Sequence, residues 1–207
     1  MSRIIKPVID NLDKQRTYRE HKGRYKRAME NEFFFEALLI DYALLEDRLR
    51  SMIYHMGFLQ NRKAHKIWKK KYSCLQEIVS MYKEDKENCQ LGISNISGKA
   101  KIVRCILKWA AYTEGDFKED PHLYTLKSQC EGLDSGGLIA AFDDLQAWCD
   151  YRNEVIHALM NKNLDSLSDN LKCHVEAGMQ LANFFDNQEK ILKKGNKVRK
   201  SANLKMD

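Results

Sequence analysis

Apolar side chains recur along residues 135–161 at steps of three, four or seven positions. That spacing is typical of an α-helix that turns one face into a protein core. The stripe consists of Leu138, Phe142, Leu145, Cys149, Ile156 and Leu159. One charged residue, Arg152, falls on the same stripe. The pattern therefore predicts a helix over 135–161, capped by Asp134 or Ser135, that carries a guanidinium at a core-facing position.

Two further segments carry helical stripes. Residues 32–56 present apolar side chains every three or four positions up to Gly57, a residue type that commonly ends helices. Residues 167–185 repeat the pattern after a predicted turn at 161–165. The chain has only two prolines and no alternating strand pairs, so we predict an all-α helical bundle over residues 31–193. A basic arm at 1–30 and a basic, disordered tail at 194–207 are expected to flank it.

Positive charge is concentrated in three stretches, although the formal net charge is only +6. Residues 1–30 hold nine Lys and Arg, and residues 190–207 hold seven. The segment 61–72 holds six and no acid, namely Arg62, Lys63, Lys66, Lys69, Lys70 and Lys71. Rows of cations gain binding free energy by releasing counterions from phosphates, so this segment is a candidate RNA-binding surface, which we expect to flank a cleft at Arg152. The alternative is charge that only keeps the protein in solution.

The arm at 1–30 has two aromatic residues, Tyr18 and Tyr25, among its cations. Aromatic rings between cations can stack on exposed bases, which makes the arm a second candidate for RNA contact. A surface helix or a mobile terminus fits the same residues equally well.

The six cysteines lie fifteen or more residues apart, which excludes the usual zinc-finger spacings. Several fall on apolar helical positions, where a free thiol packs as a small hydrophobe, so we expect a reducing, cytoplasmic compartment. The sequence has no signal segment and no apolar run long enough to span a bilayer, so no membrane partner is expected. Phosphate-binding glycine loops, nucleophile elbows and zinc-protease helices are also missing from it.

Three polar residues meet near the end of the helix predicted over 135–161. Arg152 needs a partner or a cleft, because a buried charge is costly when it is unpaired. His157 is the residue type best suited to exchange a proton near neutral pH, and Asn153 lies one helical turn before it. The structural alternatives are an ion pair of Arg152, with Asp150 or an acid of another helix, and a histidine favoured by the helix dipole.

Residues 152–157, Arg-Asn-Glu-Val-Ile-His, resemble the signature of HEPN-domain proteins, an Arg and a polar residue followed by His near the end of a long helix. The resemblance implies an HEPN-like helical bundle and a metal-independent endoribonuclease that needs no cofactor. It also implies a symmetric homodimer, because HEPN nucleases usually bring two motifs into one cleft. Related nucleases act in toxin–antitoxin, abortive-infection and CRISPR-associated systems, so a toxin or antiviral role with an antitoxin or activating partner is expected.

The residue types match this chemistry. The 2′-hydroxyl of RNA can attack the adjacent phosphorus and leave a 2′,3′-cyclic phosphate, so His157 would move the proton and Arg152 would stabilise the phosphoryl charge. Asn153 would hold the histidine or the phosphate, and Glu46 is a candidate supporting acid from the helix at 32–56. The alternatives are a non-catalytic HEPN-like module that binds RNA or a protein, and an all-α interaction protein whose stripes bury a partner helix.

Overall fold

The computed structural model describes residues 11–83, 91–115, 117–158 and 168–204. All regular secondary structure within these ranges is helical, which confirms the predicted all-α class. The elements are α1 (Asn11–Glu30), α2 (Phe34–His55), α3 (Lys69–Tyr82), α4 (Ile96–Tyr112), α5 (Pro121–Glu131), α6 (Ser135–Ala158), α7 (Ser168–Lys193), a short 3-10 turn η2 (Lys194–Asn196) and α8 (Lys197–Ser201).

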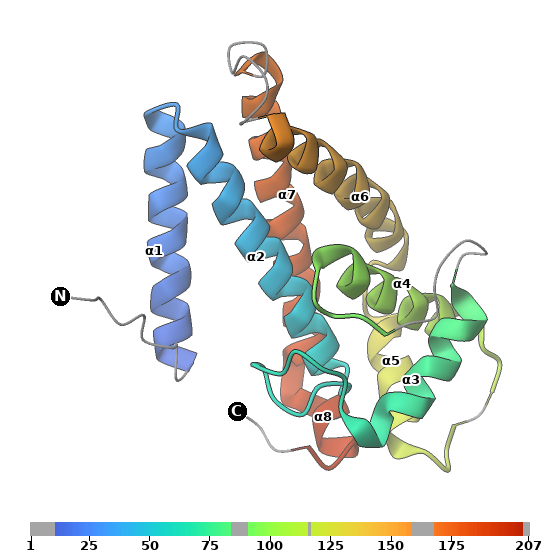
Figure 1. Ribbon diagram of the computed structural model, residues 1–207. Helices are drawn as coiled ribbons and strands as arrows, with labels where there is room; N and C mark the ends of the chain where they lie inside the picture. Colours follow the sequence, from blue (N-terminus) through green and yellow to red (C-terminus); the bar gives the residue numbers. More distant parts are fainter. Residues whose placement is uncertain (1–10, 84–90, 116, 159–167, 205–207) are drawn as a thin grey trace.

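Helix α2 is the central element of the bundle. It packs lengthwise against α7, with α1 on its other side, and α6 runs beside α7 (Figure 1). The predicted helix at 32–56 is thus confirmed, and it ends where Gly57 adopts a φ of 82°, a left-handed conformation that favours glycine. Helices α3, α4 and α5 gather toward the C-terminal end of α2, where α8 also lies (Figure 1).

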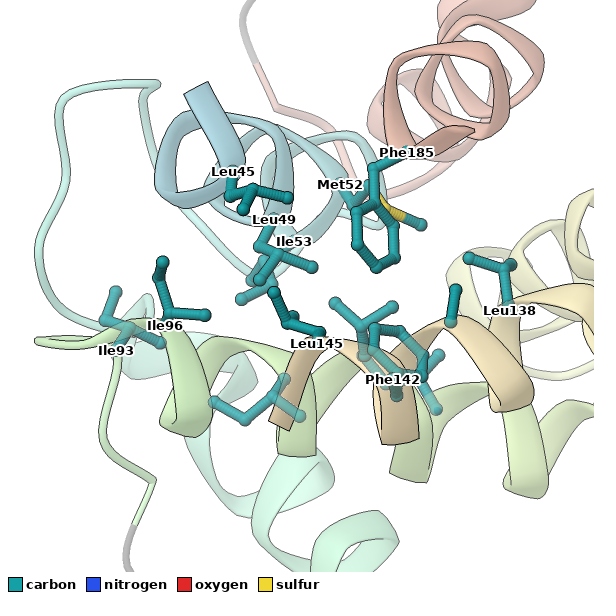
Figure 2. Close-up of a cluster of buried hydrophobic side chains, with 14 of the residues drawn as sticks. Leu45, Leu49, Met52, Ile53, Ile93, Ile96, Leu138, Phe142, Leu145 and Phe185 are labelled. Carbon is teal, nitrogen blue, oxygen red and sulfur yellow. The ribbon is translucent and has the colours of Figure 1, made fainter. Parts of the chain in front are cut away.

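The core drawn in Figure 2 lies where α2, α6 and α7 meet, with Ile96 of α4 and Ile93 just before that helix beside them. Helix α2 supplies one wall, α6 supplies the facing wall, and one aromatic ring of α7 closes the space between them. The labelled side chains of these three helices are Leu45, Leu49, Met52, Ile53, Leu138, Phe142, Leu145 and Phe185, all of which are buried. This core fixes α6 against α2 and so positions the C-terminal end of α6.

Of the alternatives for the basic N-terminal stretch, the structure shows the surface helix for residues 11–30, which form α1 and pack on α2. Its two tyrosines point inward: the Tyr18 hydroxyl donates to the Asp47 carboxylate, and the Tyr25 hydroxyl donates to the Val175 carbonyl over 3.5 Å. Ala28 is buried in the core. Residues 11–30 are therefore a surface helix of the bundle whose tyrosine rings are engaged within the protein, and residues 1–10 lie outside the described part.

The C-terminal stretch differs from the predicted disordered tail. Residues 194–204 form η2, α8 and a final turn, and the Arg199 side chain is fully buried. Its guanidinium donates to the carbonyls of Tyr54, Leu59 and Gln60 at 2.9–3.0 Å and lies 3.6 Å from the centre of the Tyr54 ring. The physical reason is that the chain after α2 is not helical, so the carbonyls of Leu59 and Gln60 can accept from a buried guanidinium, which also shares the Tyr54 carbonyl with the Gly57 amide. Residues 205–207 lie outside the described part.

Candidate functional site

Helix α6 carries the motif at its C-terminal end. It begins as predicted, with the Asp134 carboxylate accepting a hydrogen bond from the Gly137 amide over 2.9 Å. The first four residues of the predicted stripe, from Leu138 to Cys149, are buried, and Ile156 is half-buried. The described helix ends at Ala158, so Leu159 and the predicted turn at 161–165 lie outside the described residues.

Arg152 is half-buried against α2. Its guanidinium carbon lies 4.2 Å from the centre of the Tyr42 ring, and its Nη1 donates to Asn153 Oδ1 over 2.9 Å. Nε is closed off from solvent and has no hydrogen-bond acceptor. Nη2 has no acceptor among the described residues either, but it is not one of the enclosed atoms. The side chain is thus held by a ring and one amide, with Nη2 left to donate.

Arg152 makes no ion pair with a carboxylate of the described residues. Asp150, the acid considered as its partner, instead accepts a hydrogen bond from Gln146 over 2.9 Å. A structural ion pair of Arg152 would need an acidic partner, and no acid in the described part of the chain fills that role. A guanidinium with no counter-charge and an accessible Nη2 is the kind of group that an anionic ligand can pair with.

Glu46, the expected supporting acid, is engaged elsewhere. Its carboxylate accepts a hydrogen bond from Lys99 Nζ over 3.0 Å, and the Lys99 side chain is only 1% exposed. Burial lowers the pKa of Lys99, and the ion pair with Glu46 opposes that effect. Glu46 lies one helical turn beyond Tyr42, and after burial its charge is the next cause that raises the pKa of the Tyr42 hydroxyl. It makes no contact with Arg152, so the structure gives Arg152 an aromatic partner in place of this acid.

His157 lies in the last turn of α6 and is exposed. Five residues along an α-helix correspond to a rotation of about 140°, so Arg152 and His157 point to different sides of α6. Asn153 is exposed as well, and its carbonyl oxygen is turned toward Arg152. The motif residues therefore lie together at one end of α6 without sharing one face of it.

A clamp between α6 and α7, which the sequence interpretation missed, lies directly before Arg152. Trp148 Nε1 donates to the His174 carbonyl, and His174 Nε2 bonds the Trp148 carbonyl, each over 2.9 Å. The two rings stack at 5.5 Å with an angle of 6° between their planes, and the Tyr151 ring lies 4.1 Å from that of His174. Burial lowers the pKa of His174, which favours the neutral ring. We therefore interpret His174 as a structural histidine that joins α6 to α7.

The six cations predicted to bind RNA divide into two groups. Lys63, Lys66, Lys69 and Lys70 are exposed, and Lys70 lies 5.7 Å from the centre of the Trp68 ring. The other two are half-buried. Arg62 approaches His55 Nε2 at 3.2 Å, and Lys71 pairs with Asp120 at 3.9 Å.

This basic segment does not flank the motif. It follows the C-terminal end of α2, where Arg62 lies 5.3 Å from the centre of the Tyr54 ring. Arg152 contacts Tyr42 in the N-terminal half of the same helix. The two tyrosines are twelve residues apart, which corresponds to about 18 Å along the helix axis. The expectation that the basic segment lines the cleft of Arg152 is therefore not met within one copy of the chain.

Comparisons with known proteins add no family to this geometry: no family model, curated protein or solved structure matches the chain. The HEPN resemblance consequently rests on the motif and on its setting at the end of α6. Within the described ranges, no helix is long and apolar enough to cross a membrane. The same ranges contain no group of three or more His, Cys, Asp or Glu side chains placed to hold a metal ion.

Proposed function

We propose that this chain is a metal-independent endoribonuclease of the HEPN type, with Arg152, Asn153 and His157 as its catalytic group. The observation that carries the proposal is the setting of Arg152. A half-buried guanidinium whose partners are a ring and an amide keeps its full positive charge, and Nη2 still has N–H donors to offer. A phosphate oxygen is the acceptor that such a planar group binds best.

The proposed reaction is transesterification within the RNA strand. The 2′-hydroxyl attacks the adjacent phosphorus, the bond to the 5′-oxygen of the next nucleotide breaks, and the products carry 2′,3′-cyclic phosphate and 5′-hydroxyl ends. His157, exposed at the end of α6, would take the proton of the 2′-hydroxyl or give one to the leaving oxygen. Arg152 would stabilise the charge on the phosphoryl oxygens, and Asn153 would hold Arg152 in place through its carbonyl oxygen.

Because Arg152 and His157 point to different sides of α6, the proposal includes a symmetric homodimer in which the two motifs form one cleft. Mixing two inactive variants tests this arrangement. If Arg152 of one copy acts with His157 of the other, a heterodimer of Arg152→Ala and His157→Ala contains one intact site. We expect the mixture to recover part of the wild-type activity after subunit exchange. No recovery, or a monomer in sedimentation experiments, would contradict the shared site.

The direct test is incubation of the purified protein with mixed RNA in EDTA, followed by analysis of the product ends. We expect cleavage to cyclic phosphates by the wild type and its loss in Arg152→Ala and His157→Ala. Lys172→Ala is a matched control, because Lys172 is an exposed cation on the neighbouring helix α7. The proposal fails if the wild type leaves the RNA intact, or if both motif variants cleave as fast as the Lys172 variant.

By analogy with HEPN nucleases, we extend the proposal to a toxin or antiviral-defence effector that an antitoxin or activating partner controls. Expression of the wild type should then slow bacterial growth, and His157→Ala should relieve the effect. Equal toxicity of the two proteins would count against cleavage as its cause.

The separation of the basic segment from the motif favours a second candidate, a non-catalytic module that binds RNA or a protein. Four exposed lysines and Trp68 form a surface that does not depend on Arg152 or His157. For this function, replacing Lys66 and Lys69 by Glu should weaken RNA binding and flatten its salt dependence, whereas His157→Ala should leave binding unchanged. Filter binding at several salt concentrations, run beside the cleavage assay, separates the two candidates. The nuclease cleaves RNA and loses cleavage on His157→Ala, whereas the module binds RNA and cleaves none.

A further inference from the structure

We propose that Tyr42 is the positioning residue for Arg152: its ring holds one face of the guanidinium and leaves the N–H edge turned toward a phosphate. This inference rests on the proposed nuclease function and deepens it, because it names the group that replaces an acidic partner. It stands on the position of the two side chains, with the guanidinium carbon 4.2 Å from the ring centre.

The position of Tyr42 is fixed by the core. Helix α2 is anchored on both sides of it by Leu38 and Leu45, which are fully buried. Arg152 approaches from α6, which the clamp of Trp148 and His174 ties to α7 one turn earlier. The ring and the guanidinium are thus brought together by elements whose separation is set elsewhere in the bundle.

The contact with the ring has a consequence that a carboxylate would not have. A bidentate carboxylate occupies two N–H donors and cancels the charge of the guanidinium. An aromatic face attracts the cation without taking an N–H group, and it is directed at the plane of the guanidinium instead of its edge. With Nη1 bonded to Asn153 and Nε enclosed, Nη2 is the nitrogen of this guanidinium that is neither enclosed nor bonded to an acceptor among the described residues.

Two substitutions separate the ring from the rest of the tyrosine. Tyr42→Phe keeps the aromatic face and should leave kcat/KM for RNA cleavage within about twofold of the wild type. Tyr42→Leu keeps an apolar side chain but removes the ring, and it should lower kcat/KM about tenfold, the size expected for one cation–π contact. The loss should fall mainly on kcat if the held guanidinium acts in the transition state.

A double-mutant cycle then tests whether the effect passes through Arg152. Arg152→Ala is expected to leave only a small residual rate, so the cycle is measured at high enzyme concentration over long incubations. In this background Tyr42→Leu should lower the residual rate no further, because the group that the ring holds is gone. The proposal is overturned if Tyr42→Leu equals the wild type, if Tyr42→Phe loses as much as Tyr42→Leu, or if the loss persists undiminished without Arg152.

A readout that does not depend on cleavage keeps this inference distinct from the nuclease itself. The Nε–H proton of Arg152, assigned by the loss of its signal in Arg152→Lys, should resonate upfield of ordinary arginines in the wild-type NMR spectrum, since it is held against the ring face. It should also exchange slowly with solvent. Tyr42→Phe should preserve both properties, and Tyr42→Leu should abolish them. An ordinary, fast-exchanging signal in the wild type would refute the contact even without any variant. Absence of cleavage with the shifted signal present would refute the nuclease and leave the contact standing.

Discussion

Replacement of Arg199 by Ala should destabilise the protein far more than replacement of its neighbour Lys200. Arg199 is 0% exposed, and its three hydrogen bonds join α8 to the end of α2 and to residues 59–60. Lys200 is exposed on the same short helix and carries the same charge. The pair therefore separates the burial of one guanidinium from the general effect of removing a positive charge near the C-terminus.

The magnitude follows from the contacts. Hydrogen bonds with a charged donor contribute about 1.5–3 kcal/mol each, and a desolvated cation–π contact contributes about 2 kcal/mol. The desolvation of the guanidinium itself opposes these gains, and water entering the vacated space will satisfy part of the exposed carbonyls. We therefore expect Arg199→Ala to lower the free energy of unfolding by about 3–5 kcal/mol, against at most about 0.5 kcal/mol for Lys200→Ala.

Urea and thermal unfolding measure the difference, and a loss of this size corresponds to a fall in Tm of roughly 10 °C for a chain of this length. Arg199→Lys should recover little of the lost stability. The lysine ammonium lacks the planar fork of N–H groups with which the guanidinium reaches three carbonyls. Equal stability of Arg199→Ala and Lys200→Ala would refute the reasoning, since it would mean that α8 is not held by this contact.

Two further predictions concern buried positions. Burial raises the pKa of the Asp41 carboxyl to about 8. Between roughly pH 5 and 7 the folded chain therefore keeps a proton that the unfolded chain has lost. The free energy of unfolding should then fall by up to about 1.4 kcal/mol for each unit by which the pH rises through this range. Asp41→Asn should remove this contribution in urea titrations across that range, and identical pH slopes in the two proteins would contradict it. Gly57→Ala should cost about 2 kcal/mol or more, because the added Cβ would lie 2.6 Å from His122 Nε2 at a φ of +82°. Gly92→Ala, which meets open space, should stay within about 0.5 kcal/mol in the same unfolding assay, and similar losses at both glycines would refute the steric argument.

The sequence was sufficient to predict the helices that build the core, because burial leaves a periodic signal. The stripes at 32–56 and 135–161 correspond to α2 and α6, and the cap by Asp134 was predicted from its residue type. The role of Trp148 was not predicted, because α6 is also buried on a second face that packs against α7. The residues of this second face fall between those of the first stripe. A helix that packs on two neighbours shows one clear stripe and hides the other.

The surroundings of Arg152 were not predictable from local sequence. Pairing rules suggested an acid, and Glu46 stood on the expected helix, but Lys99 takes that carboxylate. Tyr42 belongs to the apolar stripe of α2, so its residue type indicated packing and gave no sign of a charge on its ring. The contact joins residues far apart in the chain, and only the packing of α6 beside α2 and α7 brings them together.

Arg152 and Arg199 both lie on tyrosine rings of α2, but they differ in the hydrogen bonds that the rest of the chain offers them. Arg199 lies on Tyr54, and three backbone carbonyls accept hydrogen bonds from its Nη1 and Nη2 atoms. Arg152 lies on Tyr42 in a similar way, yet one amide oxygen is its only hydrogen-bond acceptor among the described residues. Desolvation opposes the burial of both guanidinium groups, but only for Arg199 do hydrogen bonds to backbone carbonyls offset it. The donors that Arg152 retains, next to an exposed histidine on the same helix end, are the reason to seek an anionic substrate there.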